Sequence, residues 1–284
     1  MDTSLWLARK RRALVHPSEG VEFLMNRAAE DLADRLAAVE RRFGKAAALF
    51  CQTSAAAEVL AASGKVVDLA RVEADAAFLD GAPGLVAPFE TVPFEPQGLD
   101  LAVSLLSLQA MNDIPGMLIQ IRRALRPDGL FLGAFAGAGT LGELRESLLV
   151  AETELYGGAS PRVAPFTDVR DAGALLQRAG FALPVADVET LTVRYANLFA
   201  LMADLRAMGE TGALADRSRR PGSRRLFARA AEIYAERFCD PDGRIRASFS
   251  IVWMSGWAPD ASQQKPLRPG SAKVSLKTIL EEGR

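Results

Sequence analysis

Apolar residues recur along the chain with two periods, one typical of helices and one typical of buried strands. Between residues 20 and 42 they return every three or four positions, which predicts an amphipathic helix. The same spacing predicts helices over residues 54–62, 114–125, 141–156 and 168–179. Short apolar runs predict strands over residues 46–51, 65–69, 99–106 and 130–135.

The order of these segments predicts the fold class. Strand and helix alternate, and helices of this length between short strands require parallel pairing with both sheet faces covered. A further strand is expected at 185–195 and a last strand at 245–257. Between them we expect a helical stretch at 196–238 that is interrupted by the basic segment 217–225. We therefore expect an α/β, Rossmann-like fold: a mostly parallel sheet with helices on both faces and a helical insert before the last strand.

The same pattern suggests how the chain is divided. We expect an amino-terminal helical arm over residues 1–45 and a main domain over 46–258, with the insert at 196–246. Residues 259–284 form a tail that is rich in Pro, Gln, Ser and Lys, with no apolar period until Val274. This tail is expected to lie over the domain surface or to be mobile.

Composition and charge exclude several classes of protein. With 284 residues, 49% of them hydrophobic, the chain can bury a full core. A net charge of −1 and a pI near 6.0 argue against a nucleic-acid partner, because phosphate binding needs a surplus of Lys and Arg on one face. The sequence has no run of about 18 apolar residues and its basic start lacks the apolar centre of a signal peptide. We therefore expect a cytoplasmic protein without a transmembrane segment.

Residues that commonly build metal or nucleophilic sites are few. Cys51 and Cys239 are far apart in the sequence, which disfavours a disulfide framework, and no zinc motif can be assembled. Cys51 is interpreted as a small core residue, because no histidine lies near it to lower its pKa. His16, the only histidine, lies in a polar arm and is expected to be exposed. No catalytic residue and no metal ligand can be assigned.

Several colinear segments carry a family resemblance. Residues 122–131 (RRALRPDGLF) look like the helix, turn and strand that follow the active-site strand of class I S-adenosylmethionine (SAM)-dependent methyltransferases. More specific are NDIP at 112–115, GGASPR at 157–162, DVRDAGALLQRAGF at 168–181, LRAMG at 205–209 and SQQKP at 262–266. Together they resemble the bacterial relatives of the methyltransferase-like mitochondrial complex I assembly factor. They are also similar to the malonyl-carrier-protein methyltransferases of biotin synthesis.

This resemblance implies a class I methyltransferase fold with a seven-stranded sheet, and S-adenosylmethionine as the cofactor. For the mitochondrial relative it implies hydroxylation of an arginine on a complex I subunit. Bacterial members are usually named only as methyltransferases. A protein partner, such as a respiratory complex subunit, is the kind of partner that the resemblance implies.

The cofactor loop departs from the family pattern. Working members look like LDLGCGTG here, whereas residues 47–54 read AALFCQTS. Phe50, Gln52 and Ser54 thus replace three glycines that allow a sharp turn and a close approach to the cofactor. Ala48 replaces the acidic residue of the strand, and Pro88 replaces the usual adenine-contacting aspartate. We therefore expect SAM to bind weakly or not at all.

The resemblance still points to five positions that would contact a cofactor, namely Cys51, Gln52, Asp68, Glu90 and Leu106. Asp68 is expected at the end of the second strand, where a carboxylate would bind both ribose hydroxyls. A helix cap or a turn is the commoner role for such a residue. Glu90 is what remains of the family's acidic pair.

Three further segments allow a functional or an ordinary interpretation. Residues 137–140 (GAGT) either shape a substrate pocket or form a turn before a helix capped by Thr140. Arg162 would either clamp a substrate carboxylate or belong to an ordinary loop. The basic cluster from Arg217 to Arg225 would receive an acidic partner protein, but a charge run on a helical insert is usually solvated surface.

Two functions remain open on the sequence. The first is an active SAM-dependent methyltransferase or a related protein-modifying enzyme, which requires an open cofactor pocket. The second is a pseudoenzyme with a degenerate cofactor loop and a role in protein binding or assembly, which predicts a pocket filled by its own side chains. Family segments retained beside an eroded loop favour the second.

Overall fold

Seven strands and eight α-helices are present in the part of the chain that the structure, a computed structural model, describes: residues 1–16, 18, 20–218 and 221–264. The strands are β1 (Phe43–Leu49), β2 (Val66–Glu73), β3 (Leu85–Val86), β4 (Leu99–Leu105), β5 (Leu125–Ala136), β6 (Ala182–Tyr195) and β7 (Ile245–Trp257). The helices are α1 (Thr3–Val15), α2 (Phe23–Ala37), α3 (Ala55–Ala62), α4 (Ile114–Ala124), α5 (Gly142–Tyr156), α6 (Val169–Arg178), α7 (Leu198–Ala207) and α8 (Arg224–Phe238).

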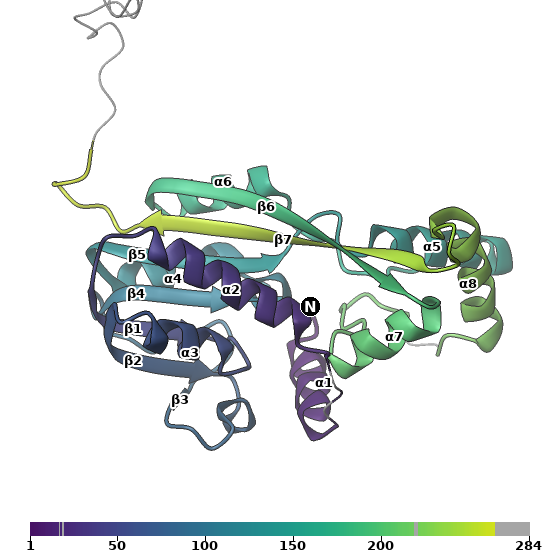
Figure 1. Cartoon of the computed structure of the whole chain (residues 1–284), viewed down its shortest axis with the longest axis horizontal. Coiled ribbons are helices and arrows are strands. Elements are labelled where there is room, and N and C mark those ends of the chain that lie inside the picture. The colour runs from purple at the N-terminus through teal and green to yellow at the C-terminus, as the bar shows by residue number, and fades with distance from the viewer. Residues whose placement is uncertain (17, 19, 219–220, 265–284) are drawn as a thin grey trace, which may run out of the picture.

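The strands form one sheet in the order β3-β2-β1-β4-β5-β7-β6 (Figure 1). The first five of these strands run parallel, and β7 runs antiparallel to both β5 and β6. The α/β, Rossmann-like fold with a mostly parallel sheet is therefore confirmed. The two helices α7 and α8 lie between β6 and β7 in the sequence, where the helical insert is expected.

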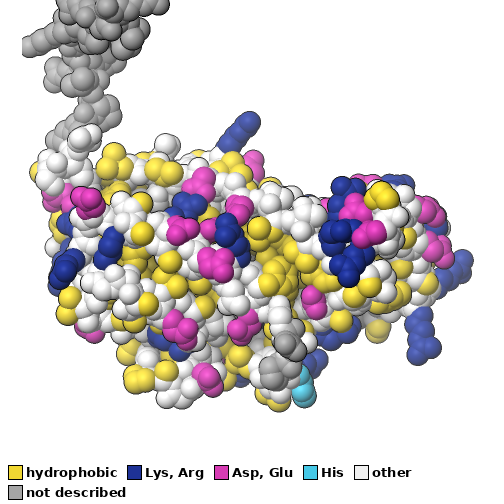
Figure 2. Space-filling view, viewed as in Figure 1, with side chains coloured by type: hydrophobic (Ala, Val, Ile, Leu, Met, Phe, Trp, Pro, Cys, Tyr) yellow, Lys and Arg dark blue, Asp and Glu magenta, His cyan; other side chains and the backbone are white. Residues whose placement is uncertain are grey.

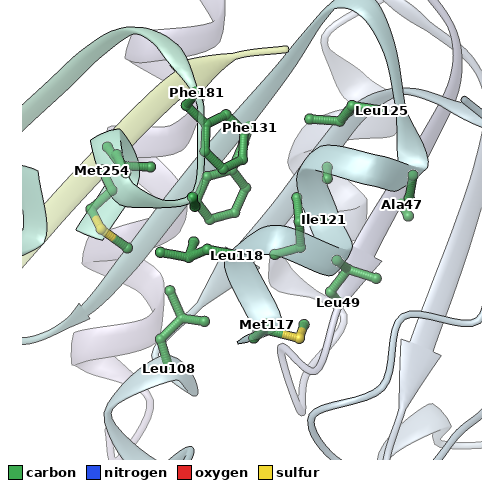
Figure 3. Close-up of a cluster of buried hydrophobic side chains, with 14 of the residues drawn as sticks. Ala47, Leu49, Leu108, Met117, Leu118, Ile121, Leu125, Phe131, Phe181 and Met254 are labelled. Atoms are coloured by element: carbon green, nitrogen blue, oxygen red, sulfur yellow. The ribbon is translucent and has the colours of Figure 1, made fainter. Parts of the chain in front are cut away.

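Helices cover both faces of the sheet, and the alternation of side chains along β1 shows why. Ala46 and Ala48 point to the face covered by α2 and α3, where they pack with Leu32. Ala47 and Leu49 point to the opposite face and join the cluster under α4 and α6 (Figure 3). A strand buried on both faces needs apolar residues at every position, which explains its unbroken apolar run.

A third apolar cluster lies beyond the main sheet. The far halves of β6 and β7 extend past their neighbours and pack against α5, α7 and α8, forming a lobe at one end of the molecule (Figure 1). Tyr195, Phe249, Leu201 and Tyr234 are among its buried residues. The described residues between α7 and α8 form no helix, so the helical stretch 196–238 is interrupted, as expected, although the break begins earlier than the basic segment, at the end of α7.

Several expected boundaries are wrong, each for a local reason. The strand expected at 65–69 continues to Glu73, because Arg71 and Glu73 are buried despite their charge and break the apolar run. The helix expected at 20–42 is shorter, since β1 begins at Phe43 and the chain turns after Ala38. The apolar spacing does not single out α1, because this helix buries little besides Trp6.

Candidate functional site

The strand order reverses between β1 and β4, and open parallel sheets bind ligands in the crevice at the carboxyl ends of such strands. Here the crevice is bounded by residues 50–54 and by Leu106. Phe50, Gln52 and Leu106 have left-handed φ angles of 55°, 64° and 52°. Outside glycine this conformation costs about 1–2 kcal/mol per residue. The backbone therefore retains a turn suited to glycine, although Phe50 and Gln52 carry full side chains.

The Phe50 side chain fills space beside the crevice. It is 1% exposed and packs in the cluster under α4 with Val72 and Ala87. Its ring meets the edge of Phe89 with centroids 5.3 Å apart, and Phe89 in turn lies 5.0 Å from the ring of Trp6 on α1. Three aromatic rings from separate parts of the chain thus form a continuous row above the end of β1.

Cys51 joins the two strands that border the crevice. Its Sγ accepts a hydrogen bond from the backbone N of Leu105 at 3.4 Å and donates to the carbonyl of Leu49 at 3.7 Å. Burial raises the pKa of the Cys51 thiol to about 12. The thiol therefore stays protonated near neutral pH and is no nucleophile. Its interpretation as a core residue agrees with its 1% exposure.

Gln52 and Glu73 form the polar part of the crevice. The backbone N of Gln52 donates to Glu73 Oε1 at 2.9 Å, and Glu73 is only 1% exposed at the carboxyl end of β2. Burial raises the pKa of Glu73 to about 8, against the opposing effects of the Gln52 N–H and of Arg71, whose guanidinium is 3.8 Å away. Glu73 Oε2 has no hydrogen-bond partner among the described residues.

Asp68 does not occupy the position predicted for it. It lies third in β2, opposite Lys45, and is exposed to solvent far from the crevice. The carboxylate at the end of this strand is Glu73, which the sequence reasoning missed because the strand was ended too early. The alternating pattern of residues 66–73 could have revealed it, since Val72 continues the strand between the charged pair.

Glu90 is committed to the protein's own backbone. Its carboxylate accepts hydrogen bonds from the backbone N of Asn112 at 2.8 Å and of Asp113 at 3.0 Å. Its carbonyl accepts another from Gln120 Nε2 at 3.0 Å. These bonds tie the loop after β3 to the start of α4. Glu90 therefore positions two loops, and both of its carboxylate oxygens are occupied.

A cavity of about 1110 Å³ opens next to the crevice, and we call it the α1 cavity. Gln52, Thr53 and Leu106 contribute to its wall from the crevice side, and α1, α5 and α7 line the rest. Most of the wall is apolar, including Leu141, Leu144, Leu148, Val163 and Phe249. Figure 2 shows hydrophobic side chains gathered between α2 and the lobe of α5, α7 and α8.

Polar contacts hold α1 against the segment that follows α7. The Lys10 ammonium pairs with Glu210 at 2.6 Å and donates to the carbonyl of Met208 at 3.0 Å. The Arg217 guanidinium pairs with Asp2 at 3.1 Å, and Asp2 N donates to the carbonyl of Ala213 at 2.8 Å. The α1 helix is therefore an anchored wall of the cavity.

Two other candidate residues are used structurally. Arg162 lies at the rim of the cavity, and its guanidinium forms two hydrogen bonds with Glu152, at 2.7 and 3.2 Å. Thr140 does not cap α5: its hydroxyl donates to the carbonyl of Ser250 and accepts from the backbone N of the same residue, each at 3.1 Å. The residue preceding α5 is Leu141, which provides no side-chain cap.

The remaining candidates give no site in the described part of the chain. His16 is exposed at the end of α1, as expected. Of the basic cluster, Arg217 is paired with Asp2, while Arg219 and Arg220 lie outside the described residues, as does the tail from Lys265 onward. Within the described ranges, no three His, Cys, Asp or Glu residues could hold a metal ion. No described helix has both the length and the apolar character to cross a membrane.

Comparison with known proteins defines the class to which this architecture belongs. Residues 43–133 match the family of methyltransferase domains. A candidate methyltransferase from Bacillus halodurans superposes with a TM-score of 0.55 and 13% identity, over 81% of this chain and 98% of the other. The YcgJ protein of Bacillus subtilis superposes with a TM-score of 0.53 and 14% identity, over 81% of this chain and 99% of the other. The chain therefore has the fold of class I methyltransferases, and part of it matches their domain family.

Several proteins with established names have sequences similar to this chain. The chain is 45% identical to the mitochondrial arginine-hydroxylase NDUFAF5 of Dictyostelium discoideum, over 65% of this chain and 42% of the relative. It is 41% identical to the Danio rerio protein of that name, over 70% of this chain and 62% of the relative. The present chain is also 37% identical to the malonyl-[acyl-carrier protein] O-methyltransferase of Laribacter hongkongensis, over 66% of this chain and 61% of the relative. Both resemblances seen in the sequence are thereby confirmed, and the matches span less than two thirds of each relative.

Proposed function

We propose that this protein keeps the methyltransferase fold but does not bind SAM in the usual pose, and that it acts by binding a protein partner. The observation that carries this proposal is the turn after β1, where Phe50 and Gln52 carry full side chains at left-handed φ angles. Phe50 is buried against Phe89 where the family has a glycine, and Cys51 bonds across to Leu105. An adenosyl group in the crevice between β1 and β4 would have to displace both contacts.

The fit of SAM is poor for steric and for electrostatic reasons. The close approach that glycines allow is blocked by the side chains of Phe50 and Gln52, whose backbones already hold the strained turn. Each carboxylate oxygen of Glu90, the remaining member of the acidic pair, already accepts a hydrogen bond from a backbone N–H group. Losing several such contacts reduces affinity by about tenfold for each 1.4 kcal/mol.

A second candidate function is an active SAM-dependent methyltransferase or a related protein-modifying enzyme. One observation favours it: Glu73 ends β2, where a carboxylate would bind ribose hydroxyls, and its Oε2 is free of partners within the described residues. The α1 cavity would then hold the substrate. This alternative requires Phe50 to move out of the cluster in which it packs.

A protein is the class of partner that the family suggests. Relatives at 41–45% identity are named arginine-hydroxylases, a name that implies a protein or an amino acid as substrate. By this resemblance the partner of the present chain is a respiratory complex subunit, and the chain works beside it in the cytoplasm. Contacts of the segments that carry the resemblance, such as that of Arg162 with Glu152, support the wall of the α1 cavity.

Isothermal titration calorimetry with SAM and with S-adenosylhomocysteine tests the proposal. We expect no heat of binding at millimolar ligand, whereas micromolar binding would refute the closed crevice and support the enzyme. The Laribacter hongkongensis relative, titrated in parallel, is a suitable positive control because it is named an O-methyltransferase.

A further inference from the structure

The α1 cavity contains buried polar atoms that the protein itself leaves without partners. Trp6 Nε1, Gln52 Nε2 and Gln109 Oε1 are all buried and have no hydrogen-bond partner among the described residues. All three residues line the α1 cavity. Trp6 is 2% exposed and Gln52 is 9% exposed, so bulk water does not compensate either group. Buried polar groups in native proteins nearly always have partners, so we expect ordered water to supply them in the empty cavity and a ligand to supply them when it displaces that water.

Neighbouring groups hold the side chains of Trp6 and Gln109 in place. The Trp6 ring lies between Phe89, at 5.0 Å, and the Lys10 ammonium, at 5.5 Å from the ring centroid. Gln109 donates its Nε2 to the carbonyl of Leu106 at 2.7 Å, which leaves Oε1 as the free acceptor. The cavity therefore presents two donors and one acceptor.

This set of polar atoms selects the chemistry of the ligand. A carboxylate would accept from the donors of Trp6 and Gln52, but it would place a second acceptor against Gln109 Oε1. A cation such as an ammonium would donate to Gln109 Oε1 but would leave the donors of Trp6 and Gln52 without an acceptor. An amide supplies a carbonyl acceptor and an N–H donor together. The surrounding wall, which includes Leu106, Leu144 and Phe249, favours apolar groups on either side of the amide.

We propose that the α1 cavity binds a short apolar peptide segment through its main-chain amides. The cavity volume of about 1110 Å³ lies at the upper end of the range for ligand pockets, which suits a segment of a few residues. The inference rests on the proposed function, because a protein partner would supply this segment. It adds the chemistry by which that partner is recognised.

Nuclear magnetic resonance with a defined probe tests this inference. The probe is N-acetyl-leucyl-leucine methylamide, and the readout is the indole N–H signal of Trp6, assigned with the Trp6→Phe variant. Trp253 is an internal reference, since its indole already donates to Asp31 at 3.3 Å in another cluster. We expect a saturable shift of the Trp6 signal at millimolar peptide and no comparable shift of the Trp253 signal.

Variants separate recognition of the amide from simple apolar binding. Gln52→Met and Gln109→Met remove a buried polar atom while keeping volume, and each should raise the Kd by about fivefold or more. Met202→Leu, a volume-conserving change elsewhere in the cavity wall, should keep the Kd within about twofold of that of the unmodified protein. Because Gln52→Met removes an unpaired buried donor, this variant should unfold at the same temperature as the parent or higher. Gln109→Met also removes the hydrogen bond to the carbonyl of Leu106 and should be somewhat less stable.

Three results would overturn the inference. The first is a Trp6 signal that does not move with millimolar peptide, and the second is an unchanged Kd in both Met variants. The third is equally tight binding of the single amide N-methylisovaleramide, which would assign a small molecule instead of a peptide. A parallel titration with S-adenosylhomocysteine keeps the proposed function separate, because its binding would refute the closed crevice whatever the peptide does.

Discussion

The crevice between β1 and β4 and the α1 cavity share residues yet differ in how their polar and apolar groups are used. In the crevice, Phe50 and Cys51 are packed or hydrogen-bonded to the protein itself. In the cavity, Trp6 and Gln109 have buried polar atoms without partners among the described residues. On the proposed function, the difference teaches that a fold can lose its usual ligand position and still retain an adjoining space suited to a ligand.

The largest effect is expected from emptying the crevice. Phe50→Ala removes a fully buried ring and should lower the free energy of unfolding by about 3–5 kcal/mol, measured by urea denaturation. Phe199→Ala makes the same change at a residue that is 53% exposed. Its free energy of unfolding should stay within about 0.5 kcal/mol of that of the parent. Similar losses for the two variants would show that Phe50 does not fill the crevice.

The buried carboxyl of Glu73 makes stability depend on pH. Burial raises the pKa of Glu73 from 4.5 to about 8, so the folded state holds this proton more tightly than the unfolded state does. The contribution of Glu73 to the free energy of unfolding is therefore constant at pH below 4.5, falls as the pH rises to about 8, and is constant again above that.

The neutral variant Glu73→Gln should not show this decline. Its free energy of unfolding relative to the parent should increase by roughly 2–4 kcal/mol across that window. The check is denaturation at both ends of the window, with Glu58→Gln as the matched change at an exposed carboxylate. Parallel pH curves for the parent and Glu73→Gln would contradict a protonated Glu73.

A smaller effect is expected at the rim of the α1 cavity. Arg162→Met would leave Glu152, whose side chain is 6% exposed, without its cation. We expect a loss of about 2 kcal/mol of unfolding free energy, because an unpaired buried carboxylate is costly. Arg178→Met is the control at an exposed position. An unchanged stability for Arg162→Met would favour its role as a clamp for a substrate.

The smallest effect concerns the anchoring of α1. Lys10→Met removes the ion pair with Glu210 and should cost less than about 1 kcal/mol of unfolding free energy, since one partner is partly exposed. Hydrogen exchange should nevertheless become faster in α1 and stay the same in α2. Unchanged exchange in α1 would mean that apolar contacts such as those of Trp6 hold the helix alone.

The sequence predicts most of the fold because the pattern of apolar residues reports burial directly. The runs in β1 and β4 and the spacing in α2 and α4 lead to the correct sheet. The carboxyl end of β2 was missed, since Arg71 and Glu73 are buried charges that interrupt the apolar run. Arg71 donates to the carbonyl of Phe78 at 2.7 Å.

The candidate site was predictable only in part. The missing glycines at 50 and 52 indicated an unusual loop, and Gln52 and Leu106 do border the α1 cavity. Asp68 was placed by a strand that was ended too early, and the role of Glu90 depends on Asn112 and Asp113, whose approach no local pattern reveals. The unpaired indole of Trp6 likewise emerges only once α1 packs on Phe89.

A crystal structure of the protein grown with a large excess of S-adenosylhomocysteine tests the central claim most directly. The account predicts that Phe50 stays packed against Phe89, that Cys51 stays bonded to Leu105, and that no adenosine lies between β1 and β4. An adenosine seen there, with its ribose hydroxyls on Glu73 and the Phe50 ring displaced, would contradict it.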